Sequence, residues 1–193
     1  MIERHRREYR IIQRLDKDTD VVPDRVIGEG DSIEGTEFGL EVLHTPGHAS
    51  DHLCFFLQEE RALFSGDLIL NGSTTVIPDE DGDLGLYMES LKRVQDLGVR
   101  RIYPAHGPVI EDGPGKIQEF IEHRLLRERQ ILETLGGGPR TIPEIVKVIY
   151  ADVDTRLHRV AAMSVHSHLR KLKSESRVSE EPVSGGPSRW TLV

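Results

Sequence analysis

The sequence contains a single cysteine, Cys54, among its 193 residues. No disulfide can form within the chain, and a zinc finger held by several thiolates is excluded. Any metal ion bound by this protein would therefore have to use histidines and carboxylates.

Long hydrophobic runs are also lacking, and the chain begins with the charged segment MIERHRREYR. No apolar stretch approaches the roughly 20 residues that a membrane-spanning helix needs. We therefore expect no membrane association and a soluble, reducing compartment. This compartment would be the cytoplasm, or the mitochondrial matrix in a eukaryote.

Basic residues are outnumbered, 25 against 33 acidic ones. A protein that coats nucleic acid or an anionic membrane through its overall field needs the opposite balance. The charge is unevenly spread, because residues 139–193 contain nine basic and six acidic residues, a net charge of +3, whereas the rest of the chain carries −11. A local basic patch in the tail is therefore still compatible with the sequence.

The chain divides into three parts by composition and pattern. Residues 1–24 form a charged lead-in, and residues 25–138 predict short strands followed by helices. The predicted strands are DSIEG, FGLEVLHT, HLCFFL and RALFSGD, most simply antiparallel, with a further short strand RRIYP. Two helices are expected, one with Leu86, Leu91, Val94 and Leu97 on a face, and one over 115–135 with an apolar stripe of Ile117, Phe120, Ile121, Leu125, Leu132 and Leu135.

The tail, residues 139–193, begins after the helix-ending segment GGGP. It predicts a helix opened by Pro143, a second helix after Asp154, and a hairpin around Gly185–Gly186. Helix, helix, hairpin is the order of a winged helix, so we expect a small winged-helix-like module here.

Three short segments present metal-competent side chains where predicted strands end. HTPGH places His48 after a tight Pro-Gly turn, SGD places Asp67 after a buried strand, and PAHG places His106 after another. A carboxylate at the mouth of a sheet is costly unless a cation or hydrogen-bond donors meet it. Histidine nitrogen and carboxylate oxygen are ordinary zinc ligands, so the three residues are candidate metal ligands.

In this order and at this spacing, HTPGH, SGD and PAHG resemble the second half of the metallo-β-lactamase superfamily pattern. The resemblance implies an α/β fold, the C-terminal half of an αββα sandwich. It also implies that His48 binds one zinc ion (Zn2+), His106 binds a second, and Asp67 bridges them. Farther along, NGSTTVI, GPVI, HRLLRERQIL and the winged-helix tail look like the branch that includes the mitochondrial β-lactamase-like endoribonuclease and its bacterial relatives.

The branch contains hydrolases of different substrates. The resemblance implies attack by a zinc-activated hydroxide on a small-molecule ester or thioester, or on a phosphodiester of single-stranded RNA. One or two zinc ions would be bound if the full ligand set is supplied. A nucleic-acid-binding role through the tail is the alternative from another class, with Arg170, Lys171 and Lys173 as the candidate phosphate contacts.

The superfamily's defining motif, His-x-His-x-Asp-His, occurs nowhere in the 193 residues. We expect it upstream of residue 1. Three interpretations are open: a fragment of an active hydrolase, which we favour; a chain whose missing ligands come from a second chain or a homo-oligomer; or a non-catalytic relative.

Other histidines fit ordinary roles better than metal binding. His44 and His52 flank the HTPGH turn and are expected to support or pack against the site. His166 and His168 have a His-x-His spacing but fall in a predicted helix. The side chains of His123, Arg124, Arg127 and Glu128 are expected on a solvated or interdomain salt-bridged helix face rather than on substrate.

Overall fold

The computed structural model describes residues 23–193, so nearly all of the expected lead-in, residues 1–24, lies outside the described residues. The elements follow in the order β1 (Ser32–Glu34), β2 (Gly39–His44), β3 (Leu53–Leu57), β4 (Ala62–Gly66), α2 (Leu84–Asp96), β5 (Arg101–Pro104), α3 (Gly113–Leu135), α4 (Ile142–Ile149), the 3-10 turn η1 (Thr155–Leu157), α5 (His158–Ser174), β6 (Val178–Glu181) and β7 (Arg189–Leu192).

The five strands β1 to β5 form one sheet in chain order. The expected antiparallel pairing holds for β1 to β4. The fifth strand, β5, for which the sequence predicted no direction, pairs parallel with β4 in the register Leu63↔Ile102. The reason is the connection, because α2 lies between the two strands and a crossover helix returns the chain in the same direction.

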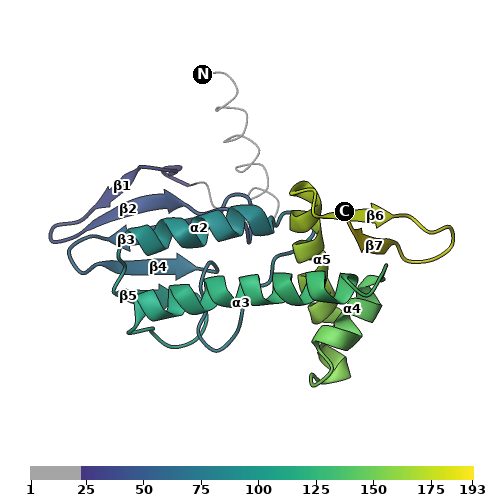
Figure 1. The fold of residues 1–193 in the computed structure, drawn as a ribbon. Coiled ribbons are helices and arrows are strands. Elements are labelled where there is room, and N and C mark those ends of the chain that lie inside the picture. The colour runs from purple at the N-terminus through teal and green to yellow at the C-terminus, as the bar shows by residue number, and fades with distance from the viewer. Residues whose placement is uncertain (1–22) are drawn as a thin grey trace, which may run out of the picture.

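Helices α2 and α3 lie side by side across one face of this sheet (Figure 1). The first core fills the space between them and the strands, with Leu43, Leu63, Leu91 and Ile102 among its buried members. Leu84, Tyr87, Met88, Leu91 and Val94 form the buried stripe of α2. Leu86, which we expected on this face, is 42% exposed, because the stripe is set by Leu84 and Tyr87.

Helix α3 continues past the end of the sheet and extends from the first core into the second (Figure 1). Ile117 and Phe120 belong to the first core, and Ile131 and Leu135 to the second. Leu125, expected on the apolar stripe, is 41% exposed. Between the cores the buried positions are taken by the charged side chains of Arg124 and Glu128, which are 4% and 8% exposed.

The second core joins α4 and α5 to the β6–β7 hairpin and the end of α3. Trp190 of β7 is buried in this core, and its backbone pairs with that of Arg140. Helix, helix, hairpin is the order predicted for a winged helix, and this expectation is confirmed.

None of the helices in residues 23–193 is long and apolar enough to cross a membrane.

Candidate metal centre

The direction of the strands brings the three candidate ligands to one edge of the sheet. β2 and β4 both run antiparallel to β3, and β5 runs parallel to β4. The carboxyl ends of β2, β4 and β5 therefore lie at the same edge. His48 follows β2, Asp67 follows β4 directly, and His106 follows β5.

Asp67 lies between the two histidines. Its Oδ2 is 3.8 Å from His48 Nε2, and its Oδ1 is 3.6 Å from His106 Nε2. The side chain of His106 is largely exposed, whereas those of His48 and Asp67 are about one-third exposed. Each carboxylate oxygen thus faces a different imidazole. This is the arrangement expected of a carboxylate that is shared between two neighbouring metal positions.

His48 is oriented through its other ring nitrogen. Nδ1 lies 2.7 Å from the carbonyl oxygen of Val76. A carbonyl only accepts hydrogen bonds, so Nδ1 carries the hydrogen, and in the neutral ring Nε2 presents its lone pair on the side of Asp67. A backbone carbonyl that fixes the tautomer in this way is the usual support of a metal-bound histidine.

His52 supports Asp67 from behind. The Asp67 backbone N–H donates to His52 Nε2 at 3.0 Å, and His52 Nδ1 lies 2.8 Å from Thr45 Oγ1. Burial, followed by the nearby His48, lowers the pKa of His52 and so favours the neutral ring that accepts this hydrogen bond. Gly66 is required beside it, because its φ is 51° and a Cβ there would lie 2.6 Å from His52 Nε2.

The remaining histidines of the sequence analysis lie elsewhere. His44 Nε2 is 2.9 Å from the carbonyl oxygen of Ser50, and His166 pairs with Asp79. His168 is buried in α5, and neither of its ring nitrogens has a partner among the described residues. His166 and His168 thus lie in a helix, as expected from the sequence. The role of Val76 could not be predicted from the sequence, because the contact is made by its backbone carbonyl and every residue has one.

The donors present fit part of a metal site. The two nitrogens and the shared carboxylate are suitable zinc ligands, and the hydrogen bond from His48 to Val76 is of the kind found behind such ligands. Within residues 23–193, however, no group of three or more His, Cys, Asp or Glu side chains is arranged to hold a metal ion alone. A four-coordinate ion would need further donors.

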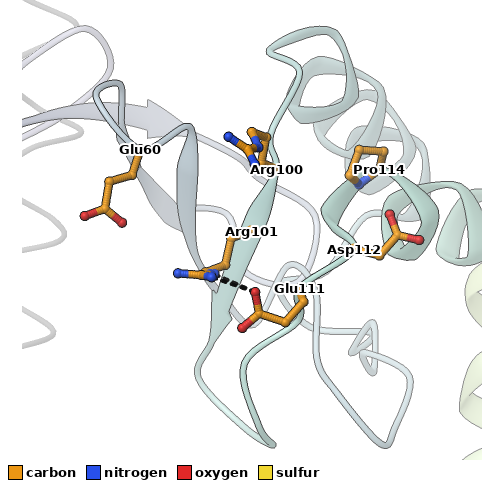
Figure 2. A pocket seen from close by; sticks show the side chains of 6 residues that line it. All are labelled: Glu60, Arg100, Arg101, Glu111, Asp112 and Pro114. Carbon is orange, nitrogen blue, oxygen red and sulfur yellow. Dashed lines mark hydrogen bonds and ion pairs between the residues drawn. The ribbon is translucent and has the colours of Figure 1, made fainter.

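A pocket of about 460 Å³ lies at the opposite end of β5, lined by charged side chains (Figure 2). Arg101 is paired with Glu111 there. The pocket lies at the start of β5, whereas His106 follows the end of this strand. The pocket is therefore not part of the candidate metal centre.

Comparison with known proteins agrees with this architecture. The family model described as the metallo-beta-lactamase superfamily matches residues 2–106, and the beta-lactamase associated winged helix domain matches residues 141–190. The chain therefore belongs to the metallo-beta-lactamase superfamily. The resemblance inferred from HTPGH, SGD and PAHG is confirmed at this level.

Similar curated proteins come from several organisms. The chain is 40% identical over 170 residues to the beta-lactamase-like protein 2 homolog of Caenorhabditis elegans, covering 88% of this chain and 56% of that protein. It is 39% identical over 185 residues to the atrochrysone carboxyl ACP thioesterase of Aspergillus chevalieri, covering 89% and 58%. The chain thus spans little more than half the length of these relatives.

Solved structures share both parts of the fold. A metallo-beta-lactamase family protein from Thermus thermophilus matches with a TM-score of 0.72 and 29% identity over 89% of this chain and 55% of that one. A beta-lactamase domain protein from Burkholderia ambifaria matches with a TM-score of 0.79 and 22% identity over 90% and 54%. The α/β fold class predicted from the sequence is confirmed.

Proposed function

We propose that this chain forms part of a zinc-dependent hydrolase that cleaves a small-molecule ester or thioester. The observation that carries the proposal is the placement of His48 and His106 on the two oxygens of Asp67, 3.8 and 3.6 Å away, at the edge of the sheet. His48 would hold one zinc ion, His106 a second, and Asp67 both.

Zinc bound there would supply an activated water and polarise the oxygen of the bond to be cleaved. The residues of this chain would hold and orient the side chains that bind the zinc. His48 offers its Nε2 lone pair because Val76 accepts the hydrogen of Nδ1. Asp67 is held through its backbone by His52, so both carboxylate oxygens are available for the ions.

The other donors would come from outside residues 23–193 or from a second chain, because zinc usually takes four ligands and each ion here finds one imidazole and a shared carboxylate. On this proposal the protein acts on a diffusible substrate in the cytoplasm or in the mitochondrial matrix.

The pairing of the three candidate phosphate contacts in the tail argues against single-stranded RNA as the preferred substrate. Lys171 bonds Glu128 and Glu175, Lys173 bonds Glu180, and Arg170 contacts Asp79. These cations are already neutralised by carboxylates of the same chain, so they offer little unpaired charge to a phosphate backbone. The name of the Aspergillus chevalieri relative, a thioesterase, favours an acyl substrate.

Zinc content measured by elemental analysis tests the proposal. After dialysis with zinc in excess, the purified 193-residue chain should retain the metal, with water or a second copy of the chain completing the coordination. The His106→Ala variant should lose at least about tenfold in affinity, because a ligand is removed rather than a supporting residue. His158→Ala is the matched control, since His158 lies at the start of α5 and bonds the Val153 carbonyl. It should bind zinc like the unchanged chain.

Equal zinc content in all three proteins would contradict the ligand assignment. If zinc is held as expected, the loaded protein should hydrolyse an acyl thioester faster than it cleaves a single-stranded RNA oligonucleotide. Cleavage of RNA alone would overturn the choice of substrate class but leave the metal site intact.

A further inference from the structure

The loop of residues 71–83, between β4 and α2, contains the carbonyl group that orients His48. The oxygen of Val76 lies 2.7 Å from His48 Nδ1. Val76 itself is 41% exposed, so its side chain is not what holds this carbonyl in place. The position of the oxygen must be fixed by the residues on either side of it.

On the N-terminal side, the loop is held by α3. Arg124 Nη2 donates to the carbonyl oxygen of Thr75, the residue before Val76. The guanidinium is buried and lies over the ring of Tyr87, 5.1 Å from its centroid. A buried, always-charged group with this bond restrains the adjoining peptide strongly.

On the C-terminal side, the loop is held by α5 of the winged-helix module. His166 Nδ1 lies 2.8 Å from Asp79 Oδ1, and Arg170 Nη1 donates to the backbone oxygen of Asp79 at 2.9 Å. Asp79 is three residues beyond Val76. The two helices therefore hold the loop on both sides of the carbonyl that His48 needs.

We infer that Asp79, held by His166 and Arg170, is a positioning residue through which the winged-helix module keeps His48 in its Nδ1–H tautomer. This inference deepens the proposed function, because the Nε2 lone pair is then ready for zinc before any metal arrives. The tail thus contributes to the metal centre without supplying a ligand.

Side-chain nitrogen NMR of the metal-free, full 193-residue chain tests the inference. At pH 8, above the ordinary pKa of histidine, the two neutral tautomers produce different ring ¹⁵N shifts. His48 is assigned by the signals missing from a His48→Gln variant. The unchanged chain should show the Nδ1–H pattern at His48. Asp79→Ala should shift it toward an average of both tautomers.

A second variant approaches the same contact from the other side. The double variant His166→Ala, Arg170→Ala leaves the loop sequence intact and should produce the same shift at His48. Lys173→Ala is the matched control, because Lys173 lies on the same helix but pairs with Glu180 of the hairpin. Its His48 signals should superimpose on those of the unchanged chain.

Unchanged His48 signals in both Asp79→Ala and the double variant would overturn the inference. A shift of the same size in Lys173→Ala would also overturn it, since that result would reflect general loosening of the module. The readout needs no metal and no substrate. A chain that never binds zinc but shows the expected tautomer shifts would refute the proposed function and support this inference.

Discussion

At the scale of single residues, the turn before His48 depends on a close approach between two backbone segments as well as on side chains. Gly47, in the turn before His48, has a φ of 136°, and a Cβ there would lie 2.4 Å from the Cα of Tyr87. Its carbonyl also accepts a hydrogen bond from the Asp83 backbone N–H. The turn is therefore pressed against the start of α2, and only glycine fits there.

We expect Gly47→Ala to lower the free energy of unfolding by at least about 2 kcal/mol, from the clash with backbone atoms and the strained φ. Urea unfolding measures this directly. Gly28→Ala is the control, because a Cβ at Gly28 meets no atom of the described residues within 4 Å, and it should change stability by less than about 0.5 kcal/mol. Equal effects of the two substitutions would contradict the packing described for the turn.

A second residue-scale prediction concerns His168, which is 1% exposed and whose ring nitrogens find no partner within residues 23–193. Burial, reinforced by the charge of Arg124, lowers its pKa to about 3. The folded state therefore keeps the ring neutral while the unfolded chain takes up a proton near its ordinary pKa of about 6.5. The stability contributed by neutral His168 is present above that pH and is lost as the pH falls toward the folded-state pKa.

Between about pH 7 and pH 5.5 this single group should cost about 1 kcal/mol of stability. The loss should disappear in His168→Leu, which has nothing to protonate. Urea unfolding at several pH values for both proteins gives the comparison. Parallel stability curves for the two proteins would show that His168 is not the group responsible.

Several of these residue-scale features could be predicted from the sequence, and others could not. His48, Asp67 and His106 could be predicted as metal ligands because each follows a predicted strand and has a turn residue beside it. This pattern can be recognised in the sequence alone. Arg124 could not be recognised as buried, since HRLLRERQ looks like a solvated helix face. Its burial depends on Thr75 and Tyr87, which are distant in the sequence and pack against α3, and no local pattern encodes this.

At the scale of elements, helix α3 contains a buried ionic group where it meets α5. Glu128 Oε2 accepts from Lys171 Nζ at 2.8 Å, and Oε1 accepts from Arg177 Nη1 at 2.6 Å. Burial alone would lower the pKa of Lys171, yet the hydrogen bonds that its ammonium group donates to Glu128 and Glu175 outweigh burial, and the pKa is raised. A salt-bridged face is predictable here from the sequence, but its burial is not.

Glu128→Ala should therefore destabilise the protein by about 1 to 2 kcal/mol, because it leaves the largely buried Lys171 and the half-exposed Arg177 with Glu175 as their remaining carboxylate. Glu119→Ala on the same helix is a suitable control. Glu119 pairs with Lys116 one turn earlier and is exposed, so its loss should cost less than about 0.5 kcal/mol. Thermal and urea unfolding would both register the difference, and similar losses would argue that the Glu128 group is solvated.

At the scale of the whole molecule, two cores are joined by one continuous helix. The chain also contains one natural reporter in each core, the single cysteine Cys54 in the first and the single tryptophan Trp190 in the second. Burial raises the pKa of the Cys54 thiol to about 12, so it should resist thiol reagents until its core opens.

We expect both reporters to show the same unfolding midpoint in urea, because α3 and the contacts of Arg124 and Glu128 couple the cores. Tryptophan fluorescence follows the second core, and the rate of Cys54 labelling follows the first. Two well-separated midpoints would mean that the modules unfold independently despite the shared helix.

The fold at this scale was predictable in outline, as short strands, two helices and a winged helix in order. The pairing of β5 was not, because its direction depends on where α2 returns the chain. The boundary at residue 138 remains a prediction. Ile131 and Leu135 lie before it in the sequence, yet they pack in the second core.

The length of α3 also restricts how the winged helix can be exchanged between related proteins. A recombination point after Gly138 would look clean in an alignment, since it falls in the GGGP turn. It would nevertheless separate α4 and α5 from the residues of α3 on which they rest. A functional graft would have to include the second half of α3, and with it Arg124 and Glu128. It would also have to include residues 71–83, which Arg124 and α5 contact.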